Sequence, residues 1–380
     1  MIKKTLYFIS ILGVICLLLP SGGAWFFVRN LPGIHIFLLA FLLAVVLTPL
    51  AIKAAFKFKI LDRPNKRKMH LKPVPRLGGA AVFTAFLIST AAASNYCFSK
   101  EFTGILAGLT LVFIVELLDD IKSNSVFLRL GAQVGAVIIL IVSGVHISVF
   151  PVFSGSIYLN YLLTFVWVVG IINAVNYLDG LDGLAAGMGI ISSLSFFAVI
   201  YLSVRPENSY LLLCLAGSCA GFLLFNKHPA RIFLGDSGSS TLGYLLGVLP
   251  LVGTWNVNNG LVGFAIPVLV LGVPIFDMLY TTITRINSHS ATTLKGFLEF
   301  TGKDHFHHRL LQKGFSLNSV VYFIYILSFV LGISALILTE CTPNDALLLL
   351  GNAVLIFVLI SLRLLPSFGS NEPLKRKVSR

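Results

Sequence analysis

The chain has 380 residues, of which 57% are hydrophobic and only 11% are charged, and its mean hydropathy is +0.92. A chain with so few polar residues cannot cover the surface of a water-soluble globule. The composition therefore excludes a soluble enzyme and favours an all-α protein that crosses a bilayer many times. The net charge of +13 could attract nucleic acid, but the sequence has no separate soluble domain or aromatic and basic platform for such binding.

The first apolar stretch covers residues 5–27 and follows a basic start. Cleaved signal peptides share these features, but many further apolar stretches follow, so we expect residues 1–30 to be retained as an additional hydrophobic helix. A membrane-embedded domain over 31–366 and a basic cytoplasmic tail over 367–380 complete the expected organisation. The five cysteines are scattered and odd in number, which indicates packing residues rather than disulfides or a zinc site.

A helix that crosses a bilayer needs about 20 mostly apolar residues, and the sequence predicts about 11–12 transmembrane helices. They lie at residues 5–27, 35–55, 79–97, 103–118, 127–145, 158–175, 185–203, 209–225, 239–253, 260–282, 318–339 and 346–364. With a cytoplasmic N-terminus, 25 of the 28 lysines and arginines fall on the inside, so the positive-inside rule predicts this orientation. The resulting basic rim would attract anionic lipid headgroups and phosphorylated ligands.

The first long inside segment, DRPNKRKMHLKPVPRLGG at residues 62–79, contains His70, Lys72 and Arg76 among its basic side chains. Such a segment can be simply an inside-positive loop, or it can bind phosphate.

Two adjacent acids, Asp119 and Asp120, close the fourth predicted helix in the sequence VELLDDIK. A single acid there would be a polar stop at the membrane edge. Two adjacent carboxylates repel each other unless a cation or a proton compensates, and the pair therefore favours a functional role.

Two short elements are expected outside the helices of the membrane domain. Residues 146–160 alternate in the manner of strands around a Ser-Gly pair, which predicts a small β-hairpin on the extracytoplasmic side. Residues 291–300 have one apolar helical face, which predicts a short helix along the cytoplasmic interface.

The sequence NAVNYLDGLDGLAAG, residues 173–187, places Asp179 and Asp182 three residues apart, with Asn176 one turn earlier. Any helical turn there would point these side chains the same way. A loop with capping aspartates is the structural alternative. However, each Asp near hydrocarbon costs a few kcal/mol, so several acids together favour function.

The sequence FNKHPARIFLGDSGSSTLG, residues 225–243, begins with Asn226 and leads through a Gly/Ser turn around Asp236 into a helix. The backbone N–H groups of such a turn suit an anion, and Asp236 can hold a hard cation. Capped Gly/Ser turns are common, so this motif alone is weak. A serine-protease interpretation fails because the chain cannot build a soluble β-barrel.

The last motif, DHFHHRLLQKGFS at residues 304–316, contains His305, His307, His308 and Arg309. Zinc binding is the alternative, but no cysteine is near and the acids of the chain suit Mg²⁺ better. Cationic histidine and arginine would match a diphosphate.

All of these motifs fall on the predicted cytoplasmic side, where helices that end on one face can converge. Hard-cation ligands, an anion-binding turn and basic loops indicate phosphoryl chemistry with Mg²⁺, and an integral membrane site suggests a lipid substrate. An ion-coupled transporter is the rival class, but transporters place charges and broken helices near the bilayer midplane. Only Glu116 and Asp277 lie appreciably inside predicted spans, both near cytoplasmic ends.

From about Asp62 to Gly314, these five motifs, in this order, resemble the polyprenyl-phosphate N-acetylhexosamine-1-phosphate transferases. The superfamily includes the phospho-MurNAc-pentapeptide transferase and the bacterial initiators of O-antigen, enterobacterial common antigen and teichoic acid linkage. The resemblance implies transfer of a sugar 1-phosphate from a UDP-N-acetylhexosamine to undecaprenyl phosphate, with release of UMP, at the inner face of the bacterial inner membrane. It also implies a multi-pass enzyme that initiates cell-envelope polysaccharide synthesis.

The resemblance assigns roles by motif, with Mg²⁺ as cofactor and Mn²⁺ as its substitute. It implies Asp236, Asn176 and Asp119 as metal ligands. The catalytic set that it implies is Asp119, Asp120, Asp179 and Asp182, with Asp119 as the acid that deprotonates or orients the lipid phosphate. The substrate-binding set is His70, Lys72, Arg76, Asn226, His305, His307, His308 and Arg309. Direct attack and an aspartyl-phosphate intermediate both remain open, and we favour direct attack.

HFHHRLL and PRLGG resemble the branch that uses GlcNAc 1-phosphate, whereas the pentapeptide branch usually has three consecutive histidines followed by an acid. We therefore expect UDP-GlcNAc, with another UDP-amino sugar or UDP-MurNAc-pentapeptide as alternatives. Two departures from the family pattern are the additional N-terminal apolar segment and a longer loop between Arg285 and Asp304. A homodimer is a further expectation.

Overall fold

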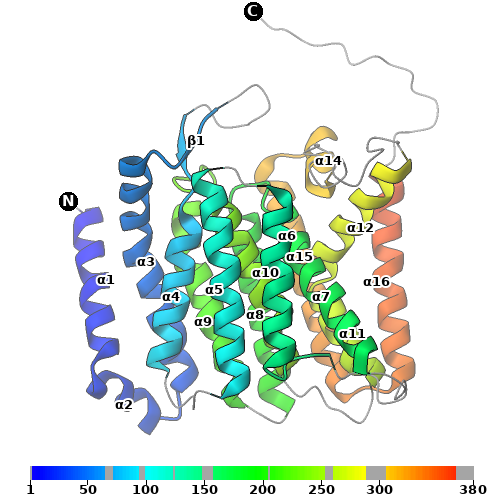
Figure 1. Cartoon of the computed structure of the whole chain (residues 1–380), viewed down its shortest axis with the longest axis horizontal. Coiled ribbons are helices and arrows are strands. Elements are labelled where there is room, and N and C mark those ends of the chain that lie inside the picture. The colour runs from blue at the N-terminus through cyan, green and yellow to red at the C-terminus, as the bar shows by residue number, and fades with distance from the viewer. Residues whose placement is uncertain are drawn as a thin grey trace, which may run out of the picture.

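The computed structural model describes residues 2–64, 72–93, 99–122, 125–147, 157–203, 206–252, 260–287 and 305–364. Figure 1 shows a bundle of long helices with roughly parallel axes, which confirms the predicted all-α membrane architecture. The described helices are α1 (Ile2–Leu18), α2 (Pro20–Val28), α3 (Pro32–Phe58), α4 (Gly78–Ala92), α5 (Lys100–Ile121), α6 (Val126–Val142), α7 (Ile157–Leu178), α8 (Leu184–Ser203), α9 (Pro206–Asn226), α10 (Gly235–Val252), α11 (Gly260–Val270), α12 (Gly272–Asn287), α14 (Phe306–Gln312), α15 (Leu317–Ile337), the 3₁₀ turn η2 (Leu338–Glu340) and α16 (Pro343–Leu364).

Within the described ranges, seven helices are long and apolar enough to cross a membrane, and the number rises to nine if each of two bent pairs forms one span. The helices α4 and α6 are apolar but shorter. The chain is therefore a multi-pass membrane protein, although not every predicted stretch is one straight span. The stretch at 5–27 bends by 71° between α1 and α2, and the stretch at 260–282 bends by 77° between α11 and α12.

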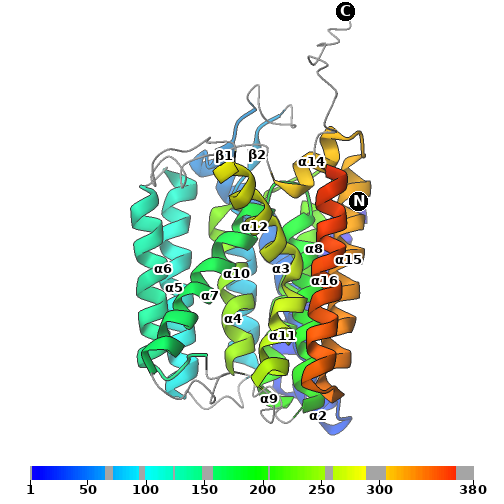
Figure 2. The same ribbon diagram turned by 90° about the vertical axis from the view of Figure 1, so that its right-hand side faces the viewer.

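The second of these bends has a cause in the sequence. Pro274 lies in the first turn of α12, and its ring nitrogen cannot donate the helical hydrogen bond that would continue α11. The chain therefore starts a new helix at Gly272 and changes direction. The bend places α12 beside α7 and near the short helix α14 (Figure 2).

The predicted hairpin at 146–160 lies largely outside the described residues, which omit 148–156. Its second strand is wrong where it can be compared, because residues 157–160 form the first turn of α7. The strands that the structure does contain are β1 (Leu61–Asp62) and β2 (Val74–Pro75), which pair antiparallel between α3 and α4. The predicted interfacial helix at 291–300 and the basic tail at 367–380 lie outside the described residues.

The additional N-terminal helix packs along the edge of the bundle. Val14 of α1 lies in a small apolar cluster with Leu39 and Leu43 of α3. The hydroxyl of Tyr7 also donates to the carbonyl of Val46 over 3.2 Å. These contacts fix α1 against α3 rather than against the centre of the bundle.

The helix α10 forms the centre of the bundle, and every side chain from Ser237 to Pro250 is buried. It packs against α4, α5 and α7. A Cβ at Gly79 of α4 would lie only 2.5 Å from the Cα of Gly238, so a larger residue there would push the two helices apart. In Figure 2, the start of α10 lies at the same end of the bundle as β1, β2 and α14, and we call this end the site end.

Candidate active site

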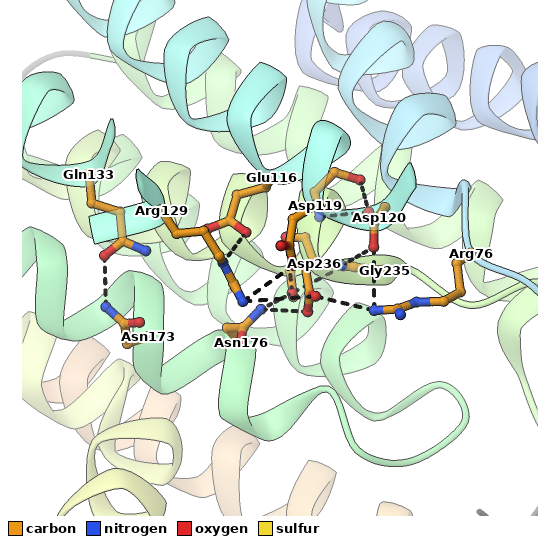
Figure 3. A network of polar contacts seen from close by, with 12 residues as sticks. Arg76, Glu116, Asp119, Asp120, Arg129, Gln133, Asn173, Asn176, Gly235 and Asp236 are labelled. Atoms are coloured by element: carbon orange, nitrogen blue, oxygen red, sulfur yellow. Dashed lines mark hydrogen bonds and ion pairs between the residues drawn. The ribbon is translucent and has the colours of Figure 1, made fainter. Parts of the chain in front are cut away.

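Asp236, in the first turn of α10, is the meeting point of side chains from three other segments (Figure 3). Its Oδ2 lies 3.2 Å from Nη2 of Arg76 and 4.0 Å from Nη1 of Arg129. Its Oδ1 accepts a hydrogen bond of 3.2 Å from Nδ2 of Asn176 at the end of α7. The structure thus brings to Asp236 side chains that lie between 60 and 160 positions away in the sequence, as the predicted convergence at one end requires.

Asp120 binds the N-terminus of α10. Its Oδ1 accepts from the backbone N–H of Asp236 at 3.0 Å, and its Oδ2 accepts from the N–H and the hydroxyl of Ser237 at 3.0 and 2.6 Å. The first N–H groups of a helix have no partner within it and attract negative charge, which explains this contact. Two N–H groups of the predicted anion-binding turn therefore bind the carboxylate of Asp120, and the binding of a substrate anion there stays a prediction.

The position of Gly235 requires a glycine. Its φ is +78°, in the left-handed region that side chains disfavour. A Cβ there would also lie 2.6 Å from the carbonyl oxygen of Arg76 and 2.7 Å from Oδ2 of Asp120. The glycine lets the chain turn tightly enough for Asp120 and Asp236 to sit side by side.

Two residues of this network, Glu116 and Arg129, were not predicted as site residues. Nε of Arg129 lies 2.7 Å from Oε2 of Glu116, which is buried, and its Nη1 lies 3.5 Å from Oδ2 of Asp119. In the sequence, Arg129 was only one of the basic residues predicted to lie on the cytoplasmic side. The feature that could have predicted this pair is Glu116, because an acid within an apolar helix needs a cation as its partner.

The backbone around Arg76 is tied to the segment that precedes α10. The N–H of Phe233 donates to Pro75 at 2.8 Å, and the N–H of Gly79 donates to Leu234 at 2.7 Å. Burial works to lower the pKa of Arg76, but the charges of Asp236 and Asp120 outweigh it and raise the pKa above its ordinary value. Arg76 is therefore a fixed cation beside the two acids.

The loop between α7 and α8 carries the other two predicted catalytic acids. Asp182 accepts from Nδ1 of His228 at 2.8 Å and from the N–H of Ala230 at 3.1 Å, so it braces the loop after α9. The amide of Asn226 is buried, accepts from Gly183 and donates to Ile232 at 2.9 Å. The structure thus gives Asn226 a positioning role, and its predicted contact with substrate stays a prediction.

Asp179 directly follows α7, is only partly exposed and interacts electrostatically with Asp236 and Asp120. Burial raises the pKa of Asp179 to about 7, and the charge of Asp236 adds to this effect while Arg76 opposes it. A proton or a cation at this place would relieve the repulsion between the acids.

This raised pKa predicts how stability depends on pH in metal-free protein. The folded carboxyl keeps a proton that the unfolded chain releases near pH 4, so its contribution to stability is lost as the pH rises toward 7. In EDTA, the apparent melting temperature of the wild type should fall more between pH 5 and pH 7 than that of Asp179→Asn, which cannot ionise. Thermal denaturation across this range measures both slopes, and parallel curves would contradict the assignment.

The histidine motif forms the start of α14 and rests on α12. Asp277, which is fully buried, accepts from Nδ1 of His305 at 3.0 Å and from the N–H of Phe306 at 2.6 Å. The ring of His305 also lies 5.2 Å from the ring of Tyr177, the residue after Asn176. The histidine motif therefore adjoins the Asp236 network at the end of α7.

The histidines differ in their surroundings. His307 is fully buried beside Gly180, and neither ring nitrogen has a hydrogen-bond partner among the described residues. Burial lowers its pKa to about 3, which opposes the cationic form, and the predicted contact of His307 with a diphosphate stays a prediction. The ring of His308 lies 4.4 Å from that of His307, and Arg309 lies over the ring of Tyr280.

The remaining predicted contacts lie in the segment between β1 and β2. Lys72 is exposed just before β2, at the site end, whereas His70 lies outside the described residues. The roles assigned to both residues stay predictions.

The network can be compared with what a divalent cation needs. No group of three His, Cys, Asp or Glu side chains in the described part of the chain forms a ready ligand set. Mg²⁺, however, usually takes one or two carboxylates and completes its shell with water and substrate phosphates. Asp236 and Asp119 offer carboxylates around a common arginine, and this donor chemistry fits Mg²⁺. Asn176 turns its amide nitrogen toward Asp236, so its role as a metal ligand stays a prediction.

Comparisons with known proteins agree with the motifs. The model of glycosyl transferase family 4 matches residues 102–254. The chain is 35% identical to the probable undecaprenyl-phosphate N-acetylglucosaminyl 1-phosphate transferase of Bacillus subtilis, over 80% of this chain and 85% of that protein. It is 33% identical to the undecaprenyl-phosphate alpha-N-acetylglucosaminyl 1-phosphate transferase of Thermotoga maritima, over 66% and 72% of the two chains.

A third relative is the decaprenyl-phosphate N-acetylglucosaminephosphotransferase of Mycobacterium tuberculosis, which is 32% identical over 77% of this chain and 79% of its own length. These similarities cover 66–80% of this chain and therefore extend beyond the matched family region. The chain therefore belongs to glycosyl transferase family 4, the superfamily of polyprenyl-phosphate N-acetylhexosamine-1-phosphate transferases that its motifs resemble, and is a membrane phosphotransferase of this type.

Proposed function

We propose that this protein transfers GlcNAc 1-phosphate from UDP-GlcNAc to undecaprenyl phosphate and releases UMP. An oxygen of the lipid phosphate attacks the phosphorus attached to the sugar. The bond between that phosphorus and the bridging oxygen breaks, and the bridging oxygen leaves with UMP. The product is a lipid diphosphate sugar.

The observation that carries this proposal is the network around Asp236. It places two arginines and several carboxylates within a few ångströms of each other at one end of a membrane bundle. Arginines suit phosphate groups, and carboxylates suit the cation that accompanies them. A site at the end of the helices can receive a soluble nucleotide from one side and a lipid headgroup from the bilayer.

Each residue has a proposed part in the transfer. Arg76 and Arg129 would bind and orient phosphate oxygens, and Asp119 would orient the attacking lipid phosphate. Asp236, Asn176 and Asp119 would hold Mg²⁺, which when bound would neutralise the diphosphate charge that develops during transfer. Asp120 would keep Asp236 in place through its contacts with the start of α10.

We also propose that the site faces the cytoplasm of a bacterial inner membrane. Most of the lysines and arginines among the described residues lie in segments at the site end of the bundle, and the positive-inside rule predicts that such segments face the cytoplasm. The nucleotide sugar would reach the site from this side. An ion-coupled transporter is disfavoured because the carboxylates gather at one end rather than at mid-depth.

Purified protein in detergent tests the proposal directly. With UDP-GlcNAc, undecaprenyl phosphate and Mg²⁺, we expect release of UMP and formation of a lipid diphosphate sugar in equal amounts. EDTA should stop the reaction, and added Mg²⁺ or Mn²⁺ should restore it, because the donor set suits a hard cation. Omission of the lipid phosphate serves as the control and should give no UMP.

The same assay decides between sugars. UDP-GlcNAc should be used with the highest kcat/KM among UDP-GlcNAc, other UDP-amino sugars and UDP-MurNAc-pentapeptide. Preference for another member of this set would correct the sugar and leave the reaction intact. Absence of UMP with every donor, from folded protein with Mg²⁺ and lipid phosphate, would refute the proposed function.

A further inference from the structure

We propose that Asp277 is a positioning residue for the reaction, because it fixes both the start of α14 and the proton of the His305 ring, and through that ring it aligns Arg285. The effect on turnover rests on the proposed function, whereas the effect on the ring does not.

The two oxygens of Asp277 serve two different groups. Oδ1 accepts from the N–H of Phe306, the first residue of α14, and Oδ2 accepts from Nδ1 of His305. Phe306 is fully buried and packs edge-on against Phe276, the neighbour of Asp277. A buried carboxylate is costly without partners, so these hydrogen bonds fasten α14 to α12.

The contact with Oδ2 determines which nitrogen of His305 carries the hydrogen. An ionised carboxylate only accepts, so Nδ1 must be the donor and Nε2 the acceptor. Nε2 lies 3.5 Å from Nη2 of Arg285, which is itself a donor, so the two contacts agree. The hydroxyl of Thr281 lies 3.2 Å from Nδ1 and shares that side of the ring.

His305 and Arg285 connect this contact to the Asp236 network. The guanidinium of Arg285 is buried and lies 5.9 Å from the centre of the Tyr177 ring. Tyr177 follows Asn176, which donates to Asp236. Asp277 therefore lies behind a cation at the edge of the site, in the way that outer carboxylates orient histidines at metal and catalytic centres.

The exchange Asp277→Asn separates the two roles. The amide oxygen can still accept from the N–H of Phe306, so α14 should stay docked. The amide nitrogen then faces Nδ1 as a donor, and the ring must move its hydrogen to Nε2. Two donors would then face each other between His305 and Arg285, and Arg285 should lose its alignment.

The experiment uses the full chain with ¹⁵N-labelled histidine in detergent, and NMR reports which ring nitrogen carries hydrogen. The His305 signals are assigned by their loss in His305→Asn. We expect hydrogen on Nδ1 in the wild type and on Nε2 in Asp277→Asn, together with a fall in kcat/KM of about 10–100-fold at a nearly unchanged melting temperature. The matched control is Asp345→Asn, at the start of α16, which should change neither reading.

A ring that keeps its hydrogen on Nδ1 in Asp277→Asn would overturn the proposal. So would a changed ring with kcat/KM within twofold of the wild type. If the ring responds as expected but the wild type releases no UMP, the proposed function fails and the contact between Asp277 and His305 stands.

A second pair of variants covers the case in which Asp277→Asn does not fold. His305→Asn keeps an N–H donor near the place of Nδ1, whereas His305→Gln does not. His305→Asn should therefore keep the melting temperature of the wild type but lose activity. His305→Gln should have a lower melting temperature and should also lose activity. Equal melting temperatures for the two variants would refute the role of Asp277.

Discussion

Replacement of Asp236 by alanine should reduce the release of UMP on the order of 10²–10³-fold or more, because it removes the central acid of the network. The protein should nevertheless fold. Arg76 keeps Asp120 at 3.4 Å, and the loss of one charge relieves the repulsion among the remaining acids. Turnover under saturating UDP-GlcNAc and Mg²⁺, with the melting temperature measured on the same preparation, checks both statements.

The conservative exchange Asp236→Asn sharpens this test, because it keeps the size of the side chain and removes its charge. The turnover of Asp236→Asn should be nearly as low as that of Asp236→Ala if the negative charge of Asp236 is what the reaction needs. Asp345→Ala, an acid-to-alanine exchange at the opposite end of the bundle, serves as the control. Near-normal turnover in Asp236→Ala would show that the proposed metal position is wrong.

Replacement of Asp120 by alanine should destabilise the protein far more than replacement of its neighbour Asp119. Asp120 accepts two backbone N–H groups and one hydroxyl at the start of α10, and hydrogen bonds to a charged group contribute about 1.5–3 kcal/mol each. The cost of burying the carboxylate offsets part of this contribution, so we expect a net loss of about 2–4 kcal/mol, which would lower the apparent melting temperature by roughly 5 °C or more.

Asp119→Ala is the matched control for this comparison. It should leave the melting temperature almost unchanged, because Arg129 retains its 2.7 Å pair with Glu116, and it should still lower turnover. Thermal denaturation of both variants in EDTA removes any contribution from a bound cation. Equal losses of stability would mean that Asp120 does not hold the start of α10.

The sequence was sufficient to predict the membrane class and the end of the bundle at which the polar motifs gather. Apolar length alone indicates a span, and alternation of spans brings every second loop to the same face. Asp236, Asn176 and Arg76 therefore meet even though their segments are far apart in the chain. The bend before α12 was not predicted, because Pro274 lies in the expected span at 260–282 but other prolines lie inside helices that continue through them, namely Pro49, Pro250 and Pro267.

The different contacts of Asp119 and Asp120 could not be predicted from the sequence. Neighbouring residues on a helix point about 100° apart, so one faces α10 and the other faces Arg129 only because packing sets the rotation of α5. The role of Asp277 depended in the same way on a partner 28 residues later. Hydrogen bonds and ion pairs of this kind depend on tertiary packing, and no local sequence pattern predicts them.

The short backbone bonds between residues 75–79 and residues 233–234 have a consequence for the design of chimeras. They hold the backbones on which Arg76 and Asp236 sit in one arrangement, and they require glycine at positions 78 and 79. A chimera that takes only one of these segments from a relative would pair two backbones that need not match. Residues 75–79 and residues 233–234 should therefore be exchanged together in any such chimera.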